Sequence, residues 1–155
     1  MTGSGQGGLL ARPVFVSGTG DKMTDCFHIK LSPEQMQGVS SLTLAHVGDA
    51  VYELLVRAEL CRRGISTADQ MHRTTVSYVS APAQAAVAEK IRGLLTEEEN
   101  AVFRRGRNAH VSSVPKGATT AEYHAATGLE TLFGWLYLSG RTERLTELCS
   151  ALFGR

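Results

Sequence analysis

The sequence predicts an all-α domain, and three features of the chain support this prediction. Capping patterns recur, such as SPEQ at residues 32–35 and TEEE at residues 96–99, in which the first and fourth residues can form a capping box. Apolar residues then follow with helical spacing, and glycines end several of these segments. The chain contains no credible strand, because the VFV segment near its start is too short.

Length and composition indicate one ordinary globular domain. The chain has 155 residues, of which 43% are hydrophobic and 20% are charged, and its net charge of +1 does not by itself indicate nucleic-acid binding. The three cysteines are widely spaced, which argues against a disulfide framework or zinc knuckle and favours a reducing compartment; Cys61 and Cys149 are expected in the core. No apolar run approaches the roughly 20 residues that span a bilayer, so no membrane partner is predicted.

The predicted domain follows a tail. Residues 1–30 are interpreted as a flexible N-terminal tail or an appended, non-native prefix, because the first 22 residues hold six glycines and little periodicity. Residues 31–155 are expected to form the domain, with Ser32 capping its first, short helix. A polar loop is expected over residues 106–119, and the remaining helices are expected over residues 41–64, 66–80, 81–95, 96–106, 121–140 and 141–153.

Two acids lie on apolar helical segments. Asp49 and Glu130 each have small residues nearby, and small side chains let two helices approach closely: Ala45 and Gly48 for the first acid, Ala126 and Gly134 for the second. If the two stripes face each other, the carboxylates meet and repel, so one takes up a proton or a cation binds between them. Oxygen ligands favour Mg²⁺ or Mn²⁺ over zinc. The alternative is that each acid pairs with an arginine, for which Arg57 is a candidate.

Several segments resemble a known family. The segments LAHVGDAVYELLVR at residues 44–57 and ATGLETLFGWLYLSG at residues 126–140 are similar to the two signature helices of the ribonuclease III family. The segments VSYVSAPAQA, FRRGRNAH and PKGATTAEYHAATGLE resemble the Mini-ribonuclease III subgroup. The resemblance extends from about residue 38 to the C-terminus, so residues 31–155 are interpreted as a catalytic domain of this type.

The resemblance implies a helical-bundle endonuclease domain that acts as a homodimer and cuts double-stranded RNA with Mg²⁺, for which Mn²⁺ can substitute. This subgroup lacks a separate double-stranded-RNA-binding domain and matures large-subunit (23S) ribosomal RNA precursors in bacteria. The expected location is therefore the bacterial cytoplasm rather than a plastid. Ribosomal proteins or the pre-ribosome are further expected partners.

By position, the resemblance implies that Asp49 and Glu130 are catalytic metal-site residues. Two other family acids are absent, because Ala45 and Thr127 stand in their places, and the number of cations therefore stays open. Glu53 is either an additional ligand or a partner of Arg57. The predicted reaction is phosphodiester hydrolysis by a water that the cation activates, without a covalent intermediate.

A basic segment, RRGRNAHVSSVPK at residues 104–116, carries four formal positive charges and no acid. Such a segment can follow the phosphates of an A-form duplex, although it can also be a solvated basic loop. The predicted RNA-binding residues are Arg104, Arg105, Arg107, Asn108, His110 and Lys116.

Two questions about the whole protein remain open at this stage. The first signature helix has more apolar surface than one core uses, which favours a two-fold homodimer over a monomer whose other helices cover that surface. Because two family acids are missing, the alternative function is a non-catalytic helical RNA-binding or assembly module with the ribonuclease III fold.

Overall fold

The computed structural model describes residues 25, 27–110 and 113–154, and this part of the chain folds into helices without strands. The predicted all-α class is therefore confirmed, while residues 1–24 of the predicted tail lie outside the described residues. None of the described helices is long and apolar enough to cross a membrane. In chain order the elements are α1 (Pro33–Gln37), α2 (Ser41–Arg62), α3 (Ala68–Val79), α4 (Ala81–Ile91), the short 3₁₀ helix η1 (Arg92–Leu94), α5 (Glu97–Arg107), α6 (Thr120–Leu138) and α7 (Thr142–Leu152).

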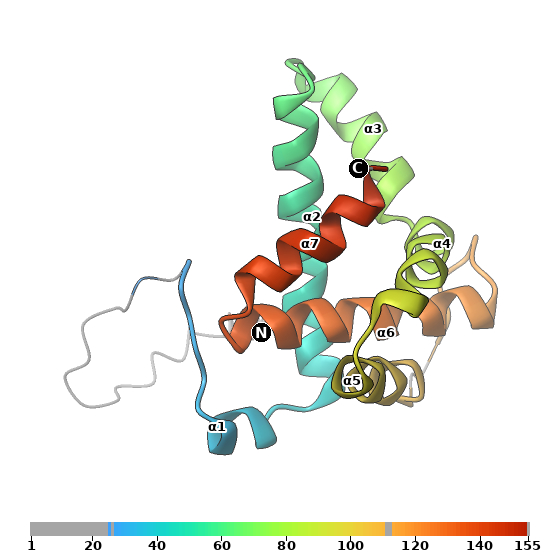
Figure 1. Cartoon of the computed structure of the whole chain (residues 1–155). Coiled ribbons are helices and arrows are strands. Elements are labelled where there is room, and N and C mark those ends of the chain that lie inside the picture. The colour runs from blue at the N-terminus through green and yellow to red at the C-terminus, as the bar shows by residue number, and fades with distance from the viewer. Residues whose placement is uncertain (1–24, 26, 111–112, 155) are drawn as a thin grey trace, which may run out of the picture.

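Helices α2 and α6 cross at the centre of the molecule, and the other helices surround this crossing (Figure 1). Two glycines allow the crossing. A Cβ atom at Gly48 would overlap the carbonyl oxygen of Glu130, and one at Gly134 would overlap that of Leu44. The backbones of the two helices are therefore in direct contact, as the small residues of the sequence predicted.

The core is built around α6, in which every residue from Thr131 to Leu136 is buried. The Tyr52 ring of α2 packs edge-on against the Phe133 ring, with 5.4 Å between the ring centroids. Buried aromatic pairs of this geometry add to the stability that burial itself provides. Helix α6 is thus held rigidly from several sides, which fixes the direction of its side chains.

Local capping signals were accurate. Ser32 with Gln35 and Thr96 with Glu99 form the predicted capping boxes at the start of α1 and α5, and Thr119 with Glu122 forms a further one at the start of α6. Gly64 follows the end of α2 with a φ of +93°, a value that glycine adopts without steric cost.

Two sequence predictions about this fold are wrong. Gly106 does not end α5, which continues to Arg107; instead Gly106 is buried, and a Cβ atom there would overlap the Thr131 side chain. The glycine therefore serves the packing of α5 on α6. Cys61 is exposed rather than in the core, whereas Cys149 is partly buried.

Candidate active site

An open pocket of about 510 Å³ lies where α2 and α6 cross, and it holds both predicted acids. Asp49 reaches it from α2 and Glu130 from α6, although most of the chain separates them in sequence. His110 and Ser113 approach from the segment between α5 and α6. The remaining lining residues come from the same two helices: Leu42, Ala45, His46, Tyr123 and Thr127.

The two carboxyl groups have different environments. Asp49 is exposed, while Glu130 is largely buried. Burial, together with the nearby charge of Asp49, raises the pKa of Glu130 to about 7. Burial and the charge of Glu53 also raise the pKa of Asp49, an effect that His46 partly offsets. The pocket therefore concentrates negative charge that a cation would relieve.

Arg57 does not neutralise these acids. Its Nε and Nη2 atoms lie 2.8 Å and 2.5 Å from Oε1 of Glu53, one turn earlier in α2. Within the described part of the chain, no lysine or arginine forms an ion pair with Asp49 or Glu130. Glu53 thus adopts the second of its two predicted roles, and it would have to leave Arg57 to reach a cation.

The donor set fits Mg²⁺. Among the described residues, no group of three or more His, Cys, Asp or Glu side chains is placed to hold a metal ion, so a closed zinc-type site is not formed. Mg²⁺ is commonly bound by one or two carboxylates and keeps several water ligands. Asp49 and Glu130, with their unrelieved repulsion and an open pocket, match this requirement.

Comparisons with known proteins agree with this geometry. Residues 42–141 match the Ribonuclease III domain, a range that includes both acids. The chain belongs to the ribonuclease III family. It is 50% identical over 110 residues to Mini-ribonuclease 3 of Symbiobacterium thermophilum, covering 71% of this chain and 85% of that protein. It is 42% identical over 118 residues to Mini-ribonuclease 3 of a Thermoanaerobacter species, covering 76% and 83% of the two chains.

A solved structure adds support for the fold. A crystal structure of a Fusobacterium nucleatum protein superposes with a TM-score of 0.71 at 28% identity, and the match covers 77% of this chain and 95% of that one. The predicted resemblance to Mini-ribonuclease III is confirmed. So is the predicted enzyme class, an endoribonuclease of the ribonuclease III family.

The two positions where this ribonuclease III family member lacks the expected acids lie in the same pocket. Ala45 and Thr127 both line it, so carboxylates at these positions would have faced Asp49 and Glu130. The Thr127 hydroxyl instead donates a hydrogen bond to the Tyr123 carbonyl oxygen at 3.0 Å. The pocket therefore holds fewer oxygen ligands than the full family pattern supplies.

Some lining residues were not identified from the sequence. His46 precedes Asp49 by three residues, which places both on one helical face, and this spacing alone was a usable signal. Tyr123 precedes Glu130 by seven residues and was detectable in the same way. Ser113 could not be found, because its position depends on the path of an irregular segment.

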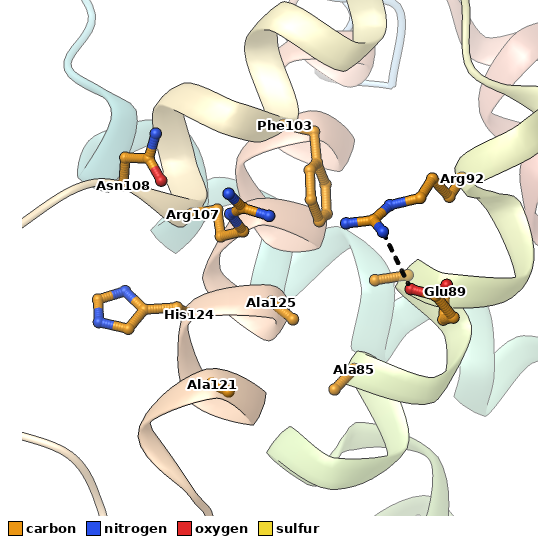
Figure 2. Close-up of a pocket in the computed structure, with 10 residues that line it drawn as sticks. Ala85, Glu89, Arg92, Phe103, Arg107, Asn108, Ala121, His124 and Ala125 are labelled. Atoms are coloured by element: carbon orange, nitrogen blue, oxygen red, sulfur yellow. Dashed lines mark ion pairs between the residues drawn. The ribbon is translucent and has the colours of Figure 1, made fainter.

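The predicted RNA-binding residues have different surroundings. His110 lines the pocket with the two acids, and Arg104 and Lys116 are exposed elsewhere. Arg107 and Asn108 line a separate pocket of about 520 Å³ between α4, α5 and α6, shown in Figure 2. Arg105 lies in a third hollow beside Trp135 and Arg141. The different surroundings of Arg104, Arg105 and Arg107 follow from the helical geometry of α5, in which successive side chains point about 100° apart.

The raised pKa of Glu130 makes stability depend on pH. The folded carboxyl keeps its proton up to a pKa of about 7, while the unfolded one releases it near 4.5. The metal-free protein therefore loses stability as pH rises through this window, and the loss persists above it. We expect Glu130→Gln to be more stable than the wild type at pH 8, by on the order of 1–3 kcal/mol.

This gain should disappear at about pH 4, where the wild-type carboxyl is protonated in both states. Urea unfolding in EDTA at the two pH values measures it. Equal stability of variant and wild type at pH 8 would show that the Glu130 carboxylate is not penalised by burial.

Proposed function

We propose that the chain is a Mg²⁺-dependent endoribonuclease that cuts double-stranded RNA. The observation that carries this proposal is the convergence of Asp49 and Glu130 in one open pocket, with no lysine or arginine of the described chain paired to either acid. Membership of the ribonuclease III family supports it independently. Mn²⁺ is expected to substitute for Mg²⁺ because it accepts the same oxygen ligands.

The residues of the pocket have separate proposed roles in binding the cation and the RNA phosphate. The bound divalent ion supplies the activation of water and the neutralisation of phosphate charge. Glu130 provides a rigid, buried ligand from α6, and Asp49 provides an exposed ligand from α2 that the RNA phosphate can approach. His46 and His110 lie beside the acids and offer nitrogen atoms that can donate hydrogen bonds to phosphate oxygens. No side chain acts as a covalent nucleophile.

Among the predicted RNA-binding residues, Arg107 and Asn108 line the pocket in Figure 2, whose side chains are best suited to bind an RNA phosphate. Figure 2 shows the guanidinium groups of Arg107 and Arg92 on either side of the Phe103 ring, and both residues line this pocket. Arg107 has no ion pair within the described chain, and Arg92 has a long one of 3.5 Å to Glu89. Two guanidinium groups that line one pocket favour the binding of an anion there, and an RNA phosphate is such an anion.

Neutralising these arginines should change the salt dependence of RNA binding. We expect Arg107→Ala and Arg92→Ala each to weaken binding and to lower the slope of log K against log salt by about 1. Arg73→Ala is the matched control, because Arg73 lies on α3, is paired with Asp69 and does not belong to the predicted RNA-binding residues. Filter binding with inactive protein at several salt concentrations measures the slopes. Unchanged slopes for both variants would remove this pocket from the RNA interface.

The finer assignments rest on the Mini-ribonuclease III resemblance. The proposed natural substrate is the precursor of large-subunit (23S) ribosomal RNA, and ribosomal proteins or the pre-ribosome are proposed partners. The proposed location is the bacterial cytoplasm. Arg104, Arg105, Asn108 and Lys116 remain predicted RNA contacts, and Glu53 remains an alternative ligand only in a state that breaks its pair with Arg57.

A homodimer is also proposed. The outer face of α2 carries a stripe of exposed small and apolar residues with helical spacing: Ala50, Leu54, Ala58 and Cys61. The Leu54 side chain is 59% exposed, and the nearby helix α3 exposes Val76. A second copy would remove this surface from water.

Light scattering should give twice the chain mass for the wild type and the mass of one chain for Leu54→Glu.

A direct assay tests the function. The protein is incubated with a long RNA duplex and with a single strand of the same sequence, with Mg²⁺ or with EDTA. The expected result is internal cleavage of the duplex in Mg²⁺ alone. Binding of the duplex without cleavage would favour the non-catalytic RNA-binding or assembly module instead.

A further inference from the structure

One buried polar side chain lies beside the candidate active site without a partner. Gln84 of α4 is 1% exposed, and neither its Oε1 nor its Nε2 atom makes a hydrogen bond. It shares a helical face with Val87, Ala88 and Ile91, which belong to the apolar core. A buried amide without a partner destabilises the folded state, so packing alone does not explain a glutamine at this position.

The nearest use for this amide is the carboxyl group of Glu130. Helix α4 packs directly against α6, which carries Glu130, and Gln84 is buried on the face of α4 that enters the core. In agreement with this packing, the Gln84 side chain lowers the pKa of Glu130 against the larger effect of burial, although neither of its polar atoms has a hydrogen-bond partner. The charge of Glu130 also raises the pKa of Tyr52, so Tyr52 is a second neighbour of this carboxyl group. Its hydroxyl is not available to Glu130, because it already donates to the Tyr78 carbonyl oxygen at 3.2 Å.

We propose that Gln84 is a positioning residue that holds the Glu130 carboxylate in the orientation required to bind the divalent cation. This inference rests on the proposed function of the site. Its Nε2 group would donate to one carboxylate oxygen and leave the other directed into the pocket. A hydrogen bond to an ionised carboxylate is roughly twice as strong as one between neutral groups. The unpaired amide would thus become paired when Glu130 binds the cation.

We expect replacement of Gln84 by methionine to keep or raise the stability of the metal-free protein and to weaken its binding of the cation. Gln84→Met keeps an unbranched side chain of similar length and removes both polar atoms. In EDTA, its melting temperature should equal or exceed that of the wild type, because the unpaired amide is gone. Its dissociation constant for Mn²⁺, measured by electron paramagnetic resonance without RNA, should rise about 10- to 100-fold.

Thr75→Val is the matched control. Thr75 is equally buried and polar, but it lies on α3 and does not line the site, so Mn²⁺ affinity should not change. Unchanged Mn²⁺ affinity in Gln84→Met would overturn the inference while the proposed metal site stands. A lower melting temperature in EDTA together with weaker binding would assign Gln84 a structural role and overturn it too. Failure of the wild type to bind Mn²⁺ would instead refute the proposed function.

A measurement on the wild type covers the case in which Gln84→Met does not fold. In nuclear magnetic resonance spectra, the side-chain amide signals of Gln84 should shift downfield when Mg²⁺ is added, because Nε2 gains a charged acceptor. The same signals should stay unchanged in Glu130→Gln. The exposed Gln70 of α3 is the internal control. Gln84 signals that do not respond to Mg²⁺ would overturn the inference.

Discussion

Replacing Asp49 by asparagine should abolish RNA cleavage and leave the fold intact. The carboxylate is exposed at the rim of the pocket, so the substitution removes a charge without opening a cavity or leaving a buried partner. Electrostatic stabilisation by a bound cation contributes several kcal/mol at the transition state. Since each 1.36 kcal/mol is a factor of ten in rate, we expect cleavage to fall about 10²- to 10⁴-fold.

Cleavage of a duplex under single-turnover conditions measures this loss, and circular dichroism checks the fold. Glu53→Gln is the matched control, because it removes a charge one turn away on the same helix. It breaks an ion pair that is partly exposed to solvent, which costs at most about 1 kcal/mol, so cleavage should remain near the wild-type rate. Loss of cleavage in Glu53→Gln, with Asp49→Asn still active, would move the metal site to Glu53.

Local signals explain why much of this fold was predictable. A capping box requires only residues three positions apart, and Thr96 with Glu99 or Thr119 with Glu122 form it whatever the rest of the chain does. The meeting of Asp49 with Glu130 was predictable for a related reason. Glycines on the same helical faces indicated that the two helices could approach closely.

Features that depend on tertiary contacts were missed. Gly106 looks like a helix end in sequence, but its lack of a side chain serves contact with Thr131, a residue of another helix. Glu99 was predicted as part of a cap, yet it is also the buried partner of Arg144 in α7, with 2.8 Å between Nε and Oε1. No spacing rule joins residues so far apart. The unpaired Gln84 amide was missed because burial cannot be read from one glutamine.

The contact between α2 and α6 makes Gly48 the position at which one added methyl group should do the most damage. In Gly48→Ala, the new Cβ atom would overlap the backbone carbonyl group of Glu130, which cannot rotate away as a side chain can. Overpacking of a core costs about 1–3 kcal/mol and more where the backbone must move. We expect the melting temperature to fall by about 5–10 °C.

Gly93→Ala is the matched control, because a Cβ atom at Gly93 meets nothing within 4 Å and its melting temperature should stay near that of the wild type. Gly48 also lies next to Asp49, so forcing the helices apart separates the two acids as well. A displacement of about 1 Å can reduce catalysis 10²-fold, and cleavage by the folded fraction of Gly48→Ala should fall accordingly. A variant that melts like the wild type and cuts at the normal rate would mean that the helices do not touch here. The close crossing would then not be what brings Asp49 and Glu130 together.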